Sequence, residues 1–83
     1  PGFQHSVFRE NAPFGLIIAN ILARPLMKLA PDLVRHLSST GTVILSGILA
    51  EQRWKVISAY RRAGLRHLRT TWMNGWVTIE LSR

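Results

Sequence analysis

The 83 residues include no cysteine. That absence excludes disulfide bonds, zinc–thiolate sites and thiol nucleophiles together, and it suits a reducing compartment such as the cytoplasm. No apolar stretch approaches the roughly 18 to 20 residues that cross a bilayer, because Asn20 interrupts "FGLIIANILA". No secretory signal is visible at the start, which opens on Pro1 and Gly2. The sequence therefore predicts a cytoplasmic protein that does not enter a membrane.

Acidic residues are scarce, since four Asp and Glu stand against eleven Lys and Arg and leave a net charge of +7. Such an excess favours acidic partners, above all nucleic acid. The cations are spread along the chain, and no aromatic-interleaved or glycine-framed RNA-binding motif accompanies them. Two interpretations stay open, a solvated basic surface and a small basic module that binds RNA or the ribosome. The module would use one predicted helix, through Arg53, Trp54, Lys55, Arg61 and Arg62.

The length allows one domain, which buries roughly 60–65% of the surface that the unfolded chain exposes. A hydrophobic content of 47% indicates a folded chain rather than a disordered one. Residues 1–13 follow neither the helical nor the strand period, and we expect an irregular lead-in there. Residues 14–83 carry the periodic segments, and we expect the folded domain there.

The first folded segment has the pattern of a strand, a helix and a second strand. Residues 14–19 form an apolar run typical of a strand covered on both faces. An apolar stripe predicts a helix from residue 25, in which Pro31 introduces a kink or divides it into two short helices. The turn residues "SSTG" end this helix, and residues 42–46 form the second strand. This order predicts parallel strands. The stripe comprises Leu26, Leu29, Ala30, Leu33 and Leu37.

A second helix is predicted from Glu51 to Ala63, with Gly64 as its C-terminal cap and Trp54 in solvent. After it, Asn74-Gly75 lies between two β-rich runs and specifies a two-residue hairpin turn. The turn fixes the pairing of the two strands, because a slip by one residue would exchange their faces. The predicted pairs are Met73–Trp76, Trp72–Val77, Thr71–Thr78, Thr70–Ile79, Arg69–Glu80 and Leu68–Leu81.

The predicted fold class is therefore α/β, in the order strand, helix, strand, helix and β-hairpin. We expect a mostly parallel sheet with one antiparallel strand near one edge. Ligands of such sheets bind beyond the carboxyl ends of the parallel strands. Those ends carry Asn20 and Gly47 here, and Asn20 is equally consistent with a helix N-cap or a loop-forming amide. His5, His36 and His67 are scattered, so we assign no catalytic side chain and no metal site.

Three blocks of the sequence resemble a known family. "FGLIIANILARPLMKLAPDL", "VILSGILAEQ" and "GWVTIEL" are similar to the C-terminal part of the bacterial ribosomal-protein methyltransferases, over about residues 13–82. These enzymes use S-adenosylmethionine to modify large-subunit ribosomal protein eleven. The resemblance implies the C-terminal half of a Rossmann-like methyltransferase sheet. It also implies that Asn20, Ile21 and Leu22 bind the cofactor.

The resemblance further implies that methyl transfer rests on placing a substrate amine in line with the cofactor's methyl group, without a side-chain nucleophile. The family's glycine-rich loop and acidic ribose anchor are absent from these residues. We therefore expect the chain alone neither to bind S-adenosylmethionine tightly nor to methylate the ribosomal protein substrate. Gly15 and Arg24 depart from the family pattern, and Arg24 brings a cation close to the expected pocket. The strand at residues 14–19 lacks its usual neighbour, so we expect self-association through that strand or a partner segment that completes the sheet.

Overall fold

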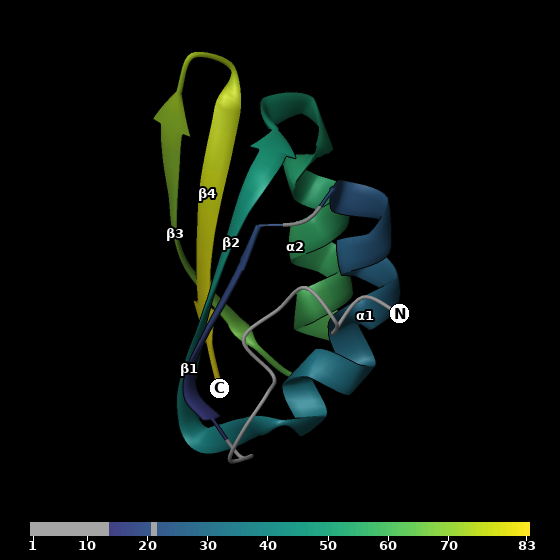
Figure 1. Cartoon of the computed structure of the whole chain (residues 1–83), viewed down its shortest axis with the longest axis vertical. Coiled ribbons are helices and arrows are strands. Elements are labelled where there is room, and N and C mark those ends of the chain that lie inside the picture. The colour runs from purple at the N-terminus through teal and green to yellow at the C-terminus, as the bar shows by residue number, and fades with distance from the viewer. Residues whose placement is uncertain (1–13, 21) are drawn as a thin grey trace.

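The computed structural model describes residues 14–20 and 22–83, and the predicted lead-in at residues 1–13 lies outside them (Figure 1). A strand, a helix and a second strand come first, and a short 3-10 turn, a helix and two strands follow. No helix within the described ranges is long and apolar enough to cross a bilayer. In chain order the elements are β1 (Phe14–Asn20), α1 (Ala23–Arg35), β2 (Leu37–Leu49), η2 (Ala50–Gln52), α2 (Arg53–Arg62), β3 (Arg66–Met73) and β4 (Trp76–Ser82).

The four strands form one sheet in the order β1-β2-β4-β3. β1 and β2 are parallel, whereas β4 is antiparallel to both of its neighbours, β2 and β3. β3 therefore runs in the same direction as β1 and β2, and β4 is the single reversed strand. The predicted arrangement of parallel strands with one antiparallel strand near an edge is confirmed.

Both helices cover the same face of the sheet (Figure 1). Alternate strand residues point toward them, so Ile17 and Ala19 of β1 are buried while Leu16 and Ile18 are 50% and 49% exposed. The prediction that this strand is covered on both faces is wrong for the described residues. The core between sheet and helices contains Ile17, Leu26, Ala30, Leu33, Val43, Leu45, Ile48, Val56, Ile57, Tyr60, Val77, Ile79 and Leu81.

α1 runs without interruption through Pro31, so the expectation of two short helices is wrong. The proline ring is exposed and the helix loses a single internal hydrogen bond there, while Ala30 and Leu33 on either side are buried in the core. The helix ends at Arg35, and Leu37 opens β2 instead of closing the helical stripe.

The "SSTG" segment was expected to be a turn and lies within β2 instead. Arg83 accounts for this difference. Its backbone N–H donates to the carbonyl of Gly41 (3.2 Å), and its guanidinium donates to the carbonyls of Ser38 (3.2 Å) and Leu37 (3.0 Å). Contacts with a residue more than 40 positions away thus hold these small polar residues extended, against their local preference for turns.

The hairpin between β3 and β4 has the predicted turn, with φ of 50° at Asn74 and 83° at Gly75. Five of the six predicted pairs are present. The pair Leu68–Leu81 is wrong, because the register shifts between His67 and Arg69 and places His67 opposite Leu81. Leu68 is the extra residue of this β-bulge and lies exposed.

Candidate functional site

The carboxyl ends of the two parallel strands lie side by side. Asn20, the last residue of β1, is the register partner of Ser46 in β2, and Ala19 is the partner of Leu45. This confirms the predicted adjacency of the asparagine-tipped strand and its serine-glycine neighbour. Gly15 stands at the opposite end of β1, where the register with β2 shifts between Phe14 and Leu16.

A second β-bulge widens the end of β2. Leu45 pairs with Ile79 and Ile48 pairs with Val77, so two residues of β2 stand opposite the single Thr78 of β4. Gly47 within the bulge has φ of 78°, a conformation that residues with a Cβ rarely adopt. The bulge bends β2 at the carboxyl ends of the parallel strands, where ligands of α/β sheets bind.

A cavity of about 430 Å³ opens at the carboxyl ends of the strands, and we call it the strand-end crevice. The first turn of α1 forms one side of it, the bulge and end of β2 form another, and the beginning of β4 completes it. The strand-end crevice is lined by Leu22, Ala23, Arg24, Pro25, Gly47, Leu49, Gln52 and Trp76.

The hairpin tip is tied to the end of β2 and so keeps β4 at the crevice. The N–H of Ala50 donates to the carbonyl of Gly75 (2.9 Å), and the guanidinium of Arg53 donates to the carbonyl of Ala50 (2.6 Å). The same guanidinium lies 4.6 Å from the ring centre of Trp72 and 5.3 Å from that of Trp54. These distances are within the range of cation–π attraction.

Of the three residues predicted to bind a cofactor, one lines the strand-end crevice. Leu22 lines the strand-end crevice and is 71% exposed. Asn20 lies at the carboxyl end of β1 but is absent from the crevice lining. Ile21 lies outside the described residues. Arg24 is also in the lining, so a cation lies at this crevice.

Sequence reasoning missed Trp76. A signal was available, because Trp76 begins a strand that the hairpin turn makes antiparallel to β3. Since β4 is also antiparallel to β2, its first residue lies at the carboxyl end of the parallel strands. The pairing of Leu49 with Trp76 shows this directly.

The chemistry of the strand-end crevice suits binding and orientation. Its walls are mainly apolar, with the guanidinium of Arg24 and the amide of Gln52 as polar groups. The side-chain oxygen of Gln52 accepts a hydrogen bond from the N–H of Leu49 (3.2 Å), so its NH₂ group can donate to a ligand. Neither His36 nor His67 lines this crevice. In the part of the chain that the structure describes, no cluster of three or more His, Asp or Glu side chains could hold a metal ion.

Comparisons with known proteins point to one family. A family model described as ribosomal protein L11 methyltransferase matches residues 3–83. A protein of that name from Allorhizobium ampelinum is 69% identical over 81 residues, which cover 98% of this chain and 28% of the relative. Another of that name, from Rhizobium rhizogenes, is 66% identical over 83 residues, again 28% of its length. The chain thus spans about 28% of the length of these relatives.

A solved structure of the same family has a similar fold. The crystal structure of a ribosomal protein L11 methylase from Lactobacillus delbrueckii subsp. bulgaricus matches with a TM-score of 0.82 and 35% sequence identity. The match covers 90% of this chain and 39% of that one. The four-stranded sheet and its two helices therefore correspond to a part of the fold of that protein.

Proposed function

Because this chain belongs to the ribosomal protein L11 methyltransferase family, we propose that it forms one wall of a methyltransferase site. That site would bind S-adenosylmethionine and transfer its methyl group to a ribosomal protein, in the cytoplasm. The observation that carries the proposal is the strand-end crevice, which lies where the parallel strands β1 and β2 end together. The comparisons do not favour the alternative of a small RNA- or ribosome-binding module.

The residues of the crevice fit this cofactor. Leu22, Leu49 and Trp76 offer apolar and aromatic surface to its adenine ring, and the NH₂ group of Gln52 offers a donor. The guanidinium of Arg24 suits its carboxylate. From the sheet edge, Asn20 offers both a donor and an acceptor, and we assign Ile21 to the same site from the family resemblance.

When bound, S-adenosylmethionine supplies an electrophilic methyl group. The part of this chain would be to hold and orient, with Trp76 and Leu22 excluding water from one side of the reacting groups. No side-chain nucleophile is required for such a transfer. Because the chain spans about 28% of its relatives, we expect it to hold one wall of the site and to bind the cofactor weakly by itself.

Titration of the isotope-labelled chain with S-adenosylmethionine, followed by NMR, tests the proposal. We expect weak binding, with a dissociation constant above about 100 μM, and resonance shifts at Leu22, Gly47 and Trp76. Asn20→Ala should weaken binding further. The matched control is Asn74→Gly, which removes an amide from the hairpin turn and keeps the positive φ. Shifts confined to other surfaces would contradict the site, and low-micromolar binding would contradict the weak affinity expected of one wall.

We also propose that strand β1 recruits a second strand. Within the described residues β1 stands at the edge of the sheet, and its outward side chains Leu16 and Ile18 are half exposed. An open strand edge next to apolar side chains is a template for pairing with another strand. If two chains paired through their β1 strands, the backbone groups of each edge would be hydrogen-bonded and the exposed side chains of Leu16 and Ile18 would be covered.

A further inference from the structure

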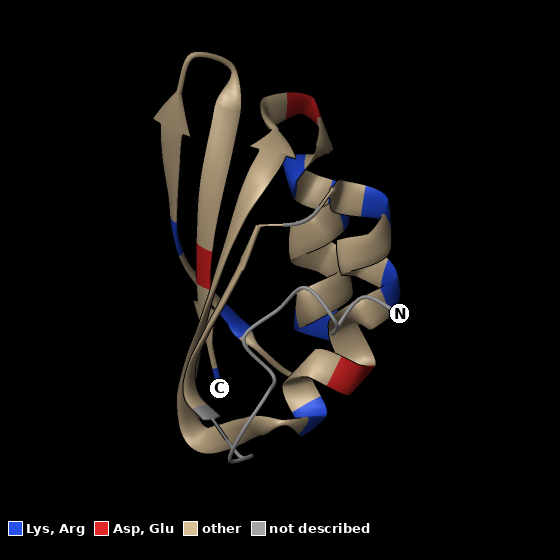
Figure 2. Cartoon of the chain, in the orientation of Figure 1, with Lys and Arg blue, Asp and Glu red and all other residues tan. Residues whose placement is uncertain are grey.

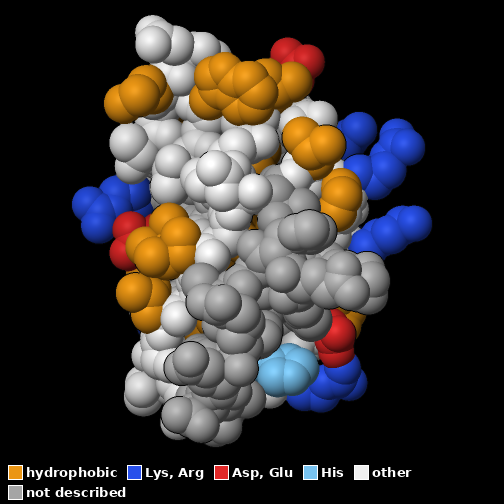
Figure 3. All heavy atoms as spheres, in the orientation of Figure 1, with side chains coloured by type: hydrophobic (Ala, Val, Ile, Leu, Met, Phe, Trp, Pro, Cys, Tyr) orange, Lys and Arg blue, Asp and Glu red, His pale blue; other side chains and the backbone are white. Residues whose placement is uncertain are grey.

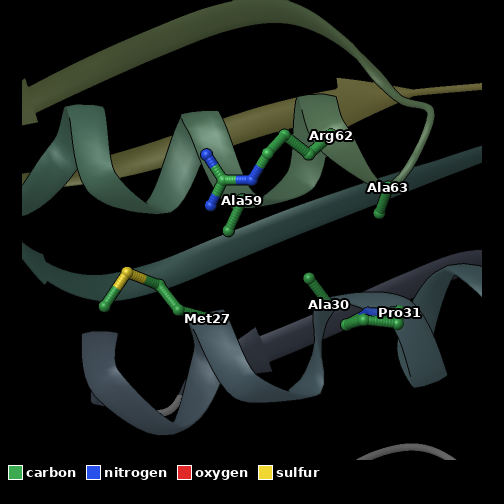
Figure 4. Close-up of a pocket in the computed structure, with 6 residues that line it drawn as sticks. All are labelled: Met27, Ala30, Pro31, Ala59, Arg62 and Ala63. Atoms are coloured by element: carbon green, nitrogen blue, oxygen red, sulfur yellow. The ribbon is translucent and has the colours of Figure 1, made fainter.

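A groove runs between the two helices. Two adjoining cavities of about 370 and 400 Å³ share Met27 and Arg62, and together they form what we call the α1/α2 groove. Met27, Ala30 and Pro31 of α1 lie across it from Ala59 and Arg62 of α2 and from Ala63, which caps α2 (Figure 4). Toward the start of α2 the groove continues along Trp54, Lys55 and Ser58.

The floor and the rim of the groove differ in polarity. Ala30 and Ala59 at its floor are buried, whereas Trp54 is 57% exposed and Lys55 and Arg62 are exposed. The floor therefore presents small aliphatic side chains, and the accessible rim presents one indole and two cations. Figure 3 shows Lys and Arg side chains projecting from the helix side of the molecule.

The helices carry most of the chain's positive charge (Figure 2). α1 and α2 together hold seven Lys and Arg against the single carboxylate of Asp32. Asp32 already pairs with Arg35, and the other ion pair within the described ranges joins Arg69 to Glu80. Lys55 and Arg62 thus have no acidic partner among the described residues. The seven cations are Arg24, Lys28, Arg35, Arg53, Lys55, Arg61 and Arg62.

We propose that the α1/α2 groove binds an acidic amphipathic helix of a partner protein. An apolar stripe on that helix would cover the aliphatic floor, and carboxylates beside the stripe would reach Lys55 and Arg62. Binding of a helix in a groove uses this combination of apolar anchors and flanking charges. Ala30, Ala59 and Ala63 permit a close approach because their side chains are short.

Pro31 leaves one backbone acceptor without its usual donor. Proline has no N–H, so the carbonyl of Met27 lacks the donor that any other residue at position 31 of the helix would provide. Met27 and Pro31 both line the groove. A hydroxyl or amide donor on the bound helix would satisfy this carbonyl and fix the register of the complex.

The two other occupants fit less well. A second copy of this chain offers no acidic helix to the groove, because its own α1 and α2 hold seven Lys and Arg against the single carboxylate of Asp32. Single-stranded RNA would find phosphate partners in Lys55 and Arg62. Its bases, however, stack best on aromatic platforms, and the groove lining contains Trp54 as its one aromatic side chain.

The test uses the 83-residue chain and three fluorescent probes. The first is a helical peptide with Leu at every third and fourth position and Glu on the flanking positions. The second has Lys in place of each Glu, and the third is single-stranded oligouridylate. We expect the acidic peptide to bind at least tenfold more tightly than the Lys peptide. Arg62→Glu and Lys55→Glu should each weaken its binding at least fivefold.

Arg61→Glu is the matched control, because Arg61 precedes Arg62 on α2, is exposed as Arg62 is, and does not line the groove. It makes the same change in net charge and should alter the affinity less than twofold. Circular dichroism establishes that the variants fold. Equal binding of the two peptides, tighter binding of the oligouridylate than of the acidic peptide, or equal effects of the substitutions at Arg61 and Arg62 would overturn the proposal.

Discussion

The hydroxyl of Tyr60 on α2 donates a hydrogen bond of 2.9 Å to the backbone carbonyl of Leu26 on α1. Both side chains are fully buried between the helices and the sheet. Burial also raises the pKa of the Tyr60 phenol far above its ordinary value of 10.0. The single tyrosine of the chain thereby fixes α1 and α2 against each other.

Tyr60→Phe should lower the free energy of unfolding by about 1 kcal/mol, since it removes one buried hydrogen bond and keeps the ring that fills the core. Tyr60→Ala should cost about 3 to 5 kcal/mol, because it adds a cavity to the lost bond. Urea denaturation of the three proteins measures both differences. Equal stability of the wild type and Tyr60→Phe would show that the hydrogen bond makes no net contribution.

The raised pKa of Tyr60 makes stability depend on alkaline pH. Its phenol ionises near 10.0 in the unfolded chain and at a higher pH in the folded chain, so above pH 10.0 the folded state holds more protons. The contribution of Tyr60 to the free energy of unfolding should therefore be constant below pH 10.0 and decrease as the pH rises above 10.0. Denaturation at a series of pH values measures the trend. Tyr60→Phe should flatten it, and an identical decrease in both proteins would assign it to other groups.

The hairpin turn provides a paired test of backbone conformation. Gly75→Ala should cost about 1 to 2 kcal/mol, because Gly75 has φ of 83° and a Cβ is strained there even though it meets no atom within 4 Å. Gly15→Ala is the control, since a Cβ at Gly15 also meets no atom within 4 Å and the backbone there does not have a positive φ. Thermal unfolding compares the two variants. Equal losses would contradict the assignment of the cost to the turn.

Arg53 tests how the strand-end crevice is held together. Arg53→Gln removes the charge between Trp54 and Trp72 and weakens the bond to the carbonyl of Ala50. We expect a loss of about 1 kcal/mol in the free energy of unfolding, together with a change in tryptophan fluorescence. Lys55→Gln, two positions further along α2 at an exposed residue, is the control and should leave both the stability and the fluorescence unchanged. A silent Arg53→Gln would mean that the hairpin tip stays in place without this contact.

The features that sequence predicted correctly are set by local rules. Asn74-Gly75 specifies a turn through backbone conformation alone, and five strand pairs follow from it by counting. The strand, helix and second strand imply parallel pairing, which brings Asn20 beside Ser46. The place of the candidate site in the fold was therefore predictable from short-range patterns.

The features that sequence missed depend on distant contacts. The segment before Thr42 is held as a strand by Arg83, which donates to the carbonyls of Leu37, Ser38 and Gly41. Arg83 lies more than 40 residues away, so no pattern near this segment predicts these bonds. The bulge at Leu68 likewise lies away from the turn, where the register between β3 and β4 shifts between His67 and Arg69. The hairpin turn fixes the direction of β4 relative to β3, but Trp76 reaches the strand-end crevice because β4 also lies beside β2, and no motif along the chain specifies that order of strands.

The proposed pairing of β1 leads to a prediction on association. Light scattering of the wild-type chain should show dimers or larger species at high concentration, and amides of residues 14–19 should be protected from exchange in them. The double variant Leu16→Lys and Ile18→Lys should shift the chain toward monomer, because it places two charges on exposed positions of the edge strand. Leu22→Lys is the control, since Leu22 is more exposed than either but lies outside β1. A wild-type chain that stays monomeric, or a control that dissociates the dimer equally well, would contradict pairing through β1.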